Sequence, residues 1–477
     1  MIYDVVIIGA GVTGTLLARE LTKYKLNICF IDKGPDAANA ASRANSGIVH
    51  AGFDAKSGSL KAKLNVRGCK MMKRITEELC VGYRNIPSLV LCFSESDRAA
   101  LNELYERGIK NGVPDLRIVE RDELVKLEPN ISDKAIAALY APSAGIVSPY
   151  ELCIAAGENA VQNGASYIFN YEVKSIAEND GIYIVSDGNS NVSARYIVAA
   201  CGIHCDDIAE MSGDLDFEII PRKGEYMLFD KNCAGCVRNV LFPLPTKNGK
   251  GVLVAPTADG NLIIGPNANV SEKDDTETTA VGLNEIYENA VKLVKTLPSL
   301  KNVITSFAGQ RPTPSTGDFI IKFSAKYKKM LHIAGIESPG LASSPAVAEY
   351  AVQLLSQAGL ILEPNIKFNP YRKKLIKIRE LSDDEKQKYI SKNPAYGKII
   401  CRCESITEGE IVDAIQRPMG ATTIDGVKRR TRAGMGRCQG GFCMPRVTEI
   451  LSRELKKDMS DIRKYGHDSI LLYGKTK

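Results

Sequence analysis

The stretch Tyr3–Lys33, YDVVIIGAGVTGTLLARELTKYKLNICFIDK, decides the fold of this chain. It opens with the apolar run Val5–Ile8, which is typical of a strand buried on both faces. Gly9, Gly11 and Gly14 follow in G-x-G-x-x-G spacing. The first glycine allows a tight turn, the second lets a pyrophosphate approach the backbone, and the third lets a helix pack closely on the strand. The stretch therefore predicts a dinucleotide-binding β-α-β unit.

The rest of this stretch supplies the other parts of such a unit. A helix is expected over 13–23, and its N-terminus directs free N–H groups at the phosphates. A second strand, Ile28–Ile31, ends at Asp32, where a carboxylate is expected to bind a ribose hydroxyl. The pattern does not separate FAD from NAD, and a tight glycine turn in an unrelated α/β protein is the alternative.

Length and composition limit the classes of protein to consider. A chain of 477 residues holds two or three domains, and 44% hydrophobic with 25% charged residues is typical of globular proteins. The net charge of +6 does not by itself indicate nucleic acid. No apolar run approaches the roughly 18 residues of a membrane span, and we expect no signal peptide and a cytoplasmic location. Thirteen scattered cysteines favour reduced thiols and a metal site over a disulfide framework.

A segment of small residues, AASRANSGIVHAGF (40–53), follows the first unit and lets backbone pass close to a flat ligand. His50, one of four histidines, is either a group of the site or a structural imidazole. The segment also offers polar side chains for a phosphate or a ribose: Ser42, Arg43, Asn45 and Ser46.

The middle of the chain is rich in strands. Glu218–Phe229 begins a block that predicts an antiparallel sheet inserted into the α/β domain. Its first strand presents Arg222, Lys223 and Tyr226 either to an anionic substrate or to solvent. The patterns also predict one strand over Tyr167–Ile176 and an amphipathic helix over Thr279–Leu297. Cys233 and Cys236 form a CxxC that is interpreted as two loop cysteines, with a redox pair as the alternative.

The last cysteines form two close pairs, Cys401-x-Cys403 and Cys438-x-x-x-x-Cys443. Four thiolates in two pairs predict sulfur ligation of either zinc or an iron–sulfur cluster. The single residue inside the first pair argues against zinc. The flanking glycines leave backbone N–H groups available to hydrogen-bond the sulfurs of a cluster. The basic run KRRTR (428–432) is interpreted as charge balance or a docking face, with a nucleic-acid patch as the alternative.

Five segments resemble the D-amino-acid-oxidase-type FAD-dependent oxidoreductases, in the branch that contains L-2-hydroxyglutarate and bacterial glycerol-3-phosphate dehydrogenases. They are GAGVTG, NSGIVHAGF with GSLKAKLNVRG, IVAACG, AGQRPTPSTGDF and IESPGLASSPAVAEY. The motif CRCE…CQGGFC resembles the 2Fe–2S domain of bacterioferritin-associated ferredoxin. The resemblance implies an α/β plus α+β protein with a Rossmann-like FAD-binding domain, an inserted antiparallel-sheet substrate domain and a small C-terminal cluster domain.

The resemblance also implies domain limits. The oxidoreductase covers 1–365, the linker 366–397, the 2Fe–2S domain 398–455 and the C-terminal tail 456–477. Within the oxidoreductase, the FAD-binding parts are about 1–85, 145–215 and 305–365, and the substrate-domain parts are about 86–144 and 216–304.

Site residues follow from the same resemblance. His50 is expected at the flavin face as a base, a substrate ligand or a covalent tether, and Arg311 is expected to bind the substrate anion. Asp32 stands where the family more often has Glu, and Cys201 where it has Ala or Gly. The FAD contacts are expected from Gly9, Gly11, Gly14, Asp32, Ser42, Ser46, Val173, Gly340, Leu341 and Ala342. The cluster ligands are expected to be Cys401, Cys403, Cys438 and Cys443.

The function implied is dehydrogenation of an anionic secondary alcohol by FAD, with electrons leaving through the 2Fe–2S centre. The first candidate substrate is sn-glycerol 3-phosphate, oxidised to dihydroxyacetone phosphate. L-2-Hydroxyglutarate is second and an amine or hydroxyproline third. The expected partner is an electron-acceptor protein, either a second flavoprotein or an iron–sulfur subunit, with membrane association only through such a partner. The alternative from another class is a non-catalytic electron-transfer or redox-sensing subunit.

Overall fold

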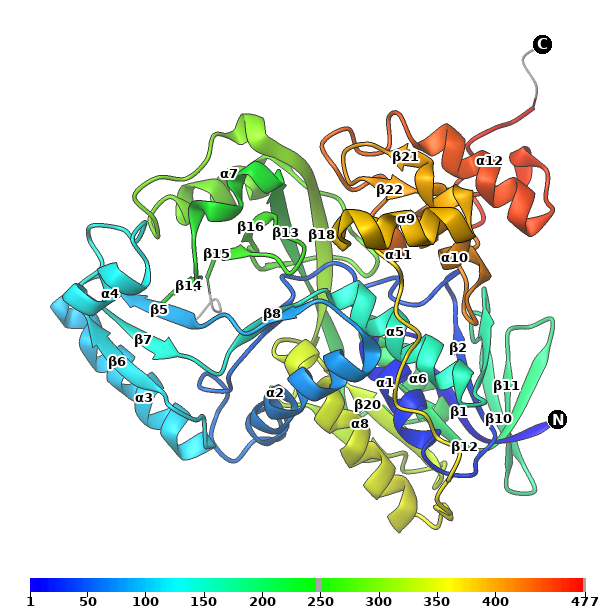
Figure 1. Ribbon diagram of the computed structural model, residues 1–477. Coiled ribbons are helices and arrows are strands. Elements are labelled where there is room, and N and C mark those ends of the chain that lie inside the picture. Colours follow the sequence, from blue (N-terminus) through cyan, green and yellow to red (C-terminus); the bar gives the residue numbers. More distant parts are fainter. Residues whose placement is uncertain (246–250, 475–477) are drawn as a thin grey trace.

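The computed structural model describes residues 1–245 and 251–474. Figure 1 shows three parts: a sheet with helices packed on it at the lower right, a larger sheet at the left, and a small helical part in orange and red at the upper right. We call them the nucleotide domain, the second sheet and the cysteine domain (398–474). This is the architecture that the sequence predicts.

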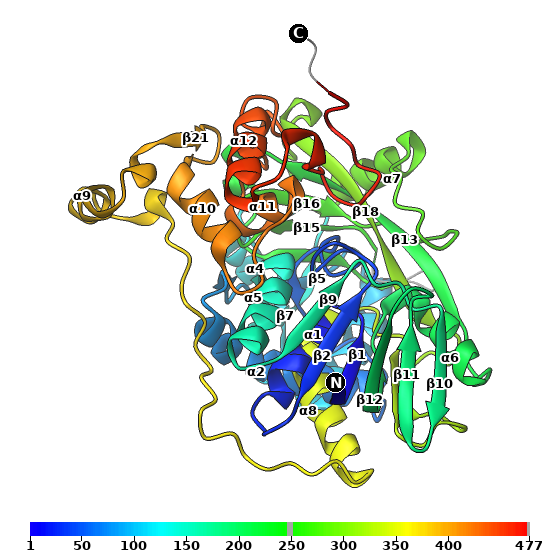
Figure 2. The same ribbon diagram turned by 90° about the vertical axis from the view of Figure 1, so that its right-hand side faces the viewer.

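The nucleotide domain is built on a sheet of order β10-β11-β12-β1-β2-β9, with β20 on β12 and β19 on β20. β1 runs parallel to both of its neighbours, so the carboxyl ends of β1, β2 and β12 meet at one edge. Figure 2 shows these strands in front. Their bounds are β1 Ile2–Ile8, β2 Ile28–Asp32, β9 Ser166–Phe169, β10 Ser175–Asn179, β11 Ile182–Ser186, β12 Asn191–Ala199, β19 Ile320–Phe323 and β20 Met330–Ala334.

The sheet is covered on both faces, as the apolar run in β1 predicts. Val5 and Ile7 pack in the cluster formed with the helices, whereas Val6 and Ile8 pack with Tyr183 on β11. α1 packs against α5 and α8, and α2 packs against α8. The helices of this domain are α1 Val12–Leu21, α2 Leu60–Leu79, α5 Pro149–Gln162, α6 Cys205–Ser212 and α8 Gly340–Gln357.

The prediction of one strand over Tyr167–Ile176 is wrong. The segment divides into β9 and β10, and Asn170 between them has φ +55°. The division arises because β9 pairs in parallel with β2, whereas β10 pairs in antiparallel fashion with β11 at the other end of the sheet. Such pairing is set by distant strands and is not visible in the local pattern.

The second sheet has the order β17-β13-β16-β15-β14-β5-β7-β6, with β18 along β13. Only the β5–β14 pairing is parallel among the described pairs of this sheet. Its strands are β5 Ser88–Cys92, β6 Arg117–Glu120, β7 Ala137–Ala141, β13 Ile219–Phe229, β14 Val240–Pro243, β15 Leu253–Pro256, β16 Leu262–Gly265, β17 Asn269–Val270 and β18 Val303–Pro314. A small sheet of β3 Ile48–Val49, β4 Tyr83–Arg84 and β8 Gly145–Val147 accompanies it.

Three helices, α3 Arg98–Asn111, α4 Arg121–Leu127 and α7 Ala280–Ala290, belong to this part. The helix predicted over Thr279–Leu297 is therefore too long. Beyond α7 the backbone pairs with another segment instead: Val294 forms a bridge with Ile131, and Ser132 N–H donates to the carbonyl of Leu293 at 3.0 Å. Leu293 and Val294, two of the apolar residues in the predicted helical pattern, are buried at this pairing.

The linker over 366–397 leaves α8 and follows the outside of the nucleotide domain to the short helix α9 Asp383–Lys392 (Figure 2). The cysteine domain follows with β21 Ile399–Cys401, β22 Ile406–Thr407, α10 Glu408–Gln416, α11 Ile424–Thr431 and α12 Met444–Leu455. Sequence patterns missed α11, a short helix whose N-cap is Thr423, with its hydroxyl accepting from Gly426 N–H. In the described ranges, no helix has the length and apolarity to cross a membrane.

Candidate active site and thiol centre

The turn after β1 requires glycine at two of its three glycine positions. Gly9 has φ +110°, and a Cβ there would lie 2.4 Å from the carbonyl oxygen of Ala200. A Cβ on Gly14 would lie 1.9 Å from the carbonyl oxygen of Gly9. The close packing of α1 on the end of β1 leaves the first turn of α1 facing open space, which suits an anionic diphosphate.

That space is a cavity of about 2320 Å³ between the nucleotide domain and the second sheet. Ordinary ligand pockets measure about 300–1,000 Å³, so this one has room for an extended dinucleotide and a small substrate together. Gly14 and Ala342 do not line it, because they are packed beneath its wall. The other predicted FAD and substrate residues do line it: Gly9, Gly11, Asp32, Ser42, Ser46, His50, Val173, Arg311, Gly340 and Leu341.

Asp32 and Ser42 hold the glycine turn in place. One carboxylate oxygen of Asp32 accepts from Ala10 N–H at 2.7 Å, and the other accepts from Gly34 N–H at 2.8 Å. Burial raises the pKa of the Asp32 carboxyl. The N-cap of α1 is Gly11, which has no side chain to accept a hydrogen bond from the helix. The Ser42 hydroxyl takes this role and accepts from the Val12 N–H at 2.9 Å. The residues at this end of the cavity therefore fit FAD, since a rigid glycine cradle and a carboxylate lie together.

Arg311 brings a partly buried positive charge to the wall of the same cavity. It lies on β18, directly opposite Arg222 on β13. Its Nη2 donates to the carbonyl of Asn267 at 3.2 Å, whereas its buried Nη1 has no hydrogen-bond partner in the described part of the chain. Gly224 makes room for it, because a Cβ there would lie 2.5 Å from Nη2. A buried guanidinium with a free donor suits a carboxylate or a phosphate.

Strand alternation separates the three polar residues predicted on β13. Arg222 and Tyr226 line the cavity. Lys223 points to the other face and pairs with Asp275 at 2.6 Å, so it is not a substrate-binding candidate. The interpretation that β13 presents all three residues to a substrate is wrong for Lys223.

His50 follows β3 and lines the cavity near α8. Its Nε2 lies 3.4 Å from the Ser338 hydroxyl, and its ring centroid lies 5.7 Å from that of Phe242. The side chain amide of Asn65 donates to the His50 carbonyl at 2.8 Å and fixes the backbone. His50 and Arg311 are thus brought to one cavity from opposite domains, which suits proton transfer beside a bound anion.

Sequence reasoning missed two charged groups of this cavity. Lys61 on α2 pairs with Glu337 at 2.6 Å, and the Thr313 hydroxyl donates to the same carboxylate at 2.8 Å. All three residues line the cavity. Their only signal was their position in the quoted segments GSLKAKLNVRG, AGQRPTPSTGDF and IESPGLASSPAVAEY.

The four C-terminal cysteines lie in two pairs. The Sγ atoms of Cys403 and Cys438 are 3.5 Å apart, and the thiols of Cys401 and Cys443 are hydrogen-bonded to each other. That bond lowers the pKa of Cys401 to about 6. Across the described ranges, no three His, Cys, Asp or Glu side chains gather where they could hold one metal ion. Two pairs of thiols fit a two-iron cluster, with two cysteines to each iron, better than a single zinc ion.

Replacing Cys403 with serine is expected to remove most of the protein-bound iron and sulfide, because a [2Fe–2S] cluster needs four thiolates. Cys403 is exposed, so its replacement leaves the packing unchanged. Iron and acid-labile sulfide analysis measures the effect, and Cys236→Ser is the matched control. Equal iron in the two variants, or zinc in place of iron, would contradict the ligand assignment.

Cys233 and Cys236 lie in a short 3-10 helix, Lys231–Cys236, that follows β13 of the second sheet. Burial raises the pKa of both thiols, that of Cys236 to about 11. Thiols with raised pKa values are poor nucleophiles at neutral pH. The interpretation as two loop cysteines therefore agrees with the structure.

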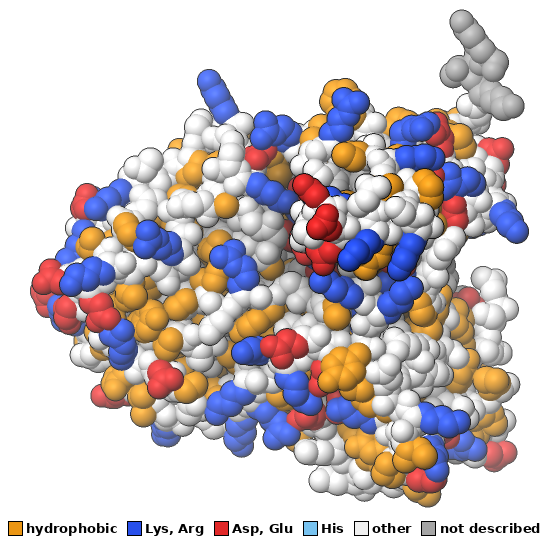
Figure 3. Space-filling view, viewed as in Figure 1, with side chains coloured by type: hydrophobic (Ala, Val, Ile, Leu, Met, Phe, Trp, Pro, Cys, Tyr) orange, Lys and Arg blue, Asp and Glu red, His pale blue; other side chains and the backbone are white. Residues whose placement is uncertain are grey.

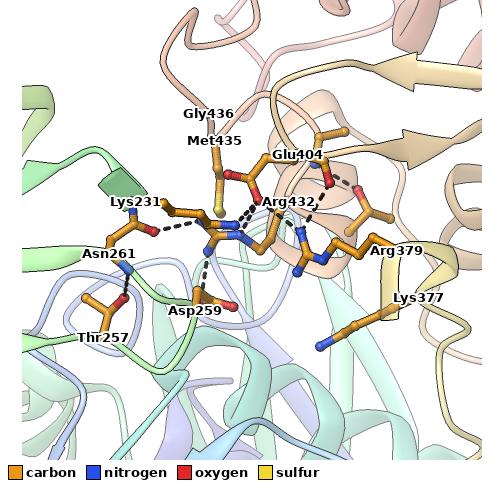
Figure 4. A network of polar contacts seen from close by, with 12 residues as sticks. Lys231, Thr257, Asp259, Asn261, Lys377, Arg379, Glu404, Arg432, Met435 and Gly436 are labelled. Carbon is orange, nitrogen blue, oxygen red and sulfur yellow. Dashed lines mark hydrogen bonds and ion pairs between the residues drawn. The ribbon is translucent and has the colours of Figure 1, made fainter. Parts of the chain in front are cut away.

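Arg432, which ends α11, joins the cysteine domain to the second sheet (Figure 4). Its Nε donates to Glu404 at 2.9 Å, its Nη1 lies 2.7 Å from Asp259, and its Nη2 donates to the Asn261 side chain at 3.1 Å. Glu404 directly follows Cys403, a predicted cluster ligand, in the chain. Arg379 and Lys231 also bind the Glu404 carboxylate, at 3.0 and 2.7 Å.

Arg430 joins the same domain to the nucleotide domain. It makes two hydrogen bonds with Asp36, of 2.6 and 2.8 Å, and Arg429 adds one of 3.2 Å. Burial alone would raise the pKa of Asp36, but Arg430 and Arg429 hold it below its ordinary value. Charged pairs this deeply buried are costly to break.

The KRRTR run is therefore a docking face within the molecule. Arg429, Arg430 and Arg432 are all buried. Figure 3 shows Lys and Arg spread over the visible face together with acidic side chains, with no single basic area. The alternative of a nucleic-acid patch lacks the exposed charges that phosphate binding requires.

Comparisons with known proteins agree with this geometry. Residues 4–354 match the family model described as FAD dependent oxidoreductase, and residues 399–453 match the model of a BFD-like [2Fe-2S] binding domain. A glycerol 3-phosphate dehydrogenase of Caloramator mitchellensis is 48% identical over 476 residues, which are 100% of this chain and 99% of that protein.

Two further relatives cover the oxidoreductase part. A glycerol 3-phosphate oxidase of Mycoplasma genitalium is 33% identical over 77% of this chain and 97% of its own length. Among solved structures, the L-alpha-glycerophosphate oxidase of Mycoplasma pneumoniae with FAD bound has a TM-score of 0.74 at 30% identity, and the match covers 78% of this chain and 98% of that one.

Proposed function

The chain belongs to the family of FAD-dependent oxidoreductases, and from that premise we propose that it is a dehydrogenase of sn-glycerol 3-phosphate whose electrons leave through its own [2Fe–2S] domain. FAD and a [2Fe–2S] cluster are its cofactors. The chemistry that they supply when bound is hydride acceptance by FAD and single-electron transfer by the cluster.

We further propose domain limits that follow the functions. The oxidoreductase is 1–365, with FAD-binding parts 1–85, 145–215 and 305–365 and substrate-domain parts 86–144 and 216–304. The linker is 366–397, the cluster domain 398–455 and the tail 456–477. Two of these limits are supported by the strands that follow them, because β5 and β13 of the second sheet begin at Ser88 and Ile219. The limit at 304 falls inside β18, which pairs with β13 in the second sheet.

The observation that carries the substrate proposal is the Arg311 guanidinium, which belongs to a residue of the cavity wall and whose Nη1 has no hydrogen-bond partner among the described residues. A buried cation with an open donor is stabilised by an anion, and a phosphate accepts two parallel hydrogen bonds from a guanidinium. His50 lies at the same cavity with its Nε2 toward Ser338, and it takes the proton of the substrate hydroxyl. The names of the relatives favour glycerol 3-phosphate among the anionic secondary alcohols.

An electron-acceptor protein, either a second flavoprotein or an iron–sulfur subunit, is the proposed partner. Cys403 is exposed, and the Phe442 side chain between Cys438 and Cys443 is 86% exposed. The Cys401–Cys443 pair is buried, so the Cys403–Cys438 edge is the one that an acceptor can approach.

Anaerobic mixing of the holoprotein with one substrate at a time tests the proposal. Glycerol 3-phosphate is expected to bleach the flavin absorbance near 450 nm at least about tenfold faster than L-2-hydroxyglutarate, since tenfold corresponds to only about 1.4 kcal/mol of binding difference. Glycerol, which lacks the phosphate, is the matched control. Equal bleaching by L-2-hydroxyglutarate would shift the assignment to a 2-hydroxy acid, and no bleaching by any candidate would favour the non-catalytic electron-transfer subunit.

A further inference from the structure

The tail of the cysteine domain reaches the far side of the cavity. Tyr465, Gly466, His467 and Asp468 line it together with the glycine turn. The tail is fixed to the start of α11, because the N–H groups of Ile424 and Asp425 donate to the carbonyls of Arg463 and Lys464 at 3.2 and 2.9 Å. The wall of the nucleotide site is therefore completed by a segment that belongs to another domain.

The Tyr465 ring contacts two guanidinium groups, one from each domain. The Arg43 carbon Cζ is 4.8 Å from the centroid of its ring, and that of Arg429 is 5.6 Å away. The Tyr465 hydroxyl donates to the carbonyl of Asn39 at 3.5 Å. Cation–π contacts of this length are attractive and are stronger when water is excluded.

Of the two arginines at Tyr465, Arg43 lines the cavity, next to the FAD candidate Ser42, and Arg429 does not. Within residues 1–245 and 251–474, no carboxylate forms an ion pair with it. Arg429 shares Asp36 with Arg430, and its Nε and Nη1 have no hydrogen-bond partner in the same ranges. Asp32, Asp36 and Asp425 also lie around this group, but none of them is hydrogen-bonded to Arg43 in the described ranges, so an anion in the cavity would give its guanidinium a partner.

We propose that Tyr465 clamps Arg43 toward the cavity, so that FAD binding and the docking of the C-terminal tail stabilise each other. The diphosphate of FAD is the anion that gives Arg43 this partner. Because such coupling is reciprocal, FAD holds the tail as much as the tail holds FAD.

The first test is the affinity of the full-length protein for FAD in the Tyr465→Ala variant. Its dissociation constant is expected to rise about 5–10-fold, since two cation–π contacts are lost. Fluorescence of FAD released on dilution measures the constant, and iron content reports on the cluster domain. Tyr465→Phe keeps the ring and is expected to bind FAD like the wild type.

The matched control is Tyr473→Ala, a tyrosine of the same tail that is 90% exposed. It is expected to leave FAD affinity unchanged. Equal FAD affinity in Tyr465→Ala and Tyr473→Ala would overturn the clamp.

A second measurement uses the unaltered protein and does not depend on how a variant folds. Trypsin can cut after Lys464, whose side chain is exposed beside Tyr465. Cleavage there is expected to be several-fold slower with FAD bound than after FAD removal, because the ligand stabilises the docked tail. The same cleavage rate with and without FAD would overturn the proposal.

Discussion

Replacing Glu158 with alanine is expected to lower the free energy of unfolding by about 3–5 kcal/mol, the range for removing one partner of a buried ion pair. The Glu158 side chain on α5 is 2% exposed. Its Oε2 lies 2.6 Å from Arg372 Nε and 2.7 Å from Arg417 Nε, and its Oε1 lies 3.6 Å from Arg430 Nε. Without the carboxylate, three buried guanidinium groups from the linker and the cysteine domain would face one another.

Urea unfolding followed by circular dichroism measures this effect. Burial alone would raise the pKa of Glu158, but the arginines hold it below its ordinary value. The stabilisation is therefore present at neutral pH and is lost as the pH falls below about 4.3 toward the lowered pKa. Glu363→Ala is the control, because Glu363 is 63% exposed and pairs with Lys25 at the surface, where such pairs contribute about 0–1 kcal/mol. A loss no larger than that of the control would contradict the role of Glu158.

Replacing Arg311 with alanine is expected to lower kcat/KM for glycerol 3-phosphate by about 10²–10³-fold. This corresponds to about 3–4 kcal/mol, within the range for truncating one partner of a buried charged pair. Arg311→Lys is expected to recover only part of the loss, since an ammonium group cannot form the two parallel bonds of a guanidinium. Steady-state kinetics with an artificial electron acceptor measure both variants.

The loss of kcat/KM in Arg311→Ala should depend on the charge of the substrate. The slow turnover of glycerol is expected to be unchanged in Arg311→Ala, because glycerol has no anion for the guanidinium to bind. Arg117→Ala is the matched control, as Arg117 lies on β6 of the same sheet and pairs with Glu123 at the surface. Equal losses with glycerol and glycerol 3-phosphate would show a general disturbance of the site in place of anion binding.

Much of the fold and part of the site were predictable because their causes are local. The glycine turn, the helix after it and the two cysteine motifs, 401–403 and 438–443, each depend on residues close in sequence. Gly9, Gly11 and Asp32 of the first unit line the cavity for that reason. Predictions failed where pairing with distant strands decides the outcome, as in Tyr167–Ile176 and beyond α7.

The sequence by itself determined that a dinucleotide turn, an inserted sheet and a paired-cysteine domain share this chain. Only the tertiary structure decided which charged side chains are buried and which partners they bind. The sequence of a basic run does not show whether its side chains are solvated or buried. KRRTR forms a docking face because Asp36 and Asp259 lie opposite it. Lys223 and Arg222 are adjacent in sequence, yet only one faces the cavity. The tail reaches Arg43 for the same physical reason: burial and charge pairing depend on distances that only the packed chain sets.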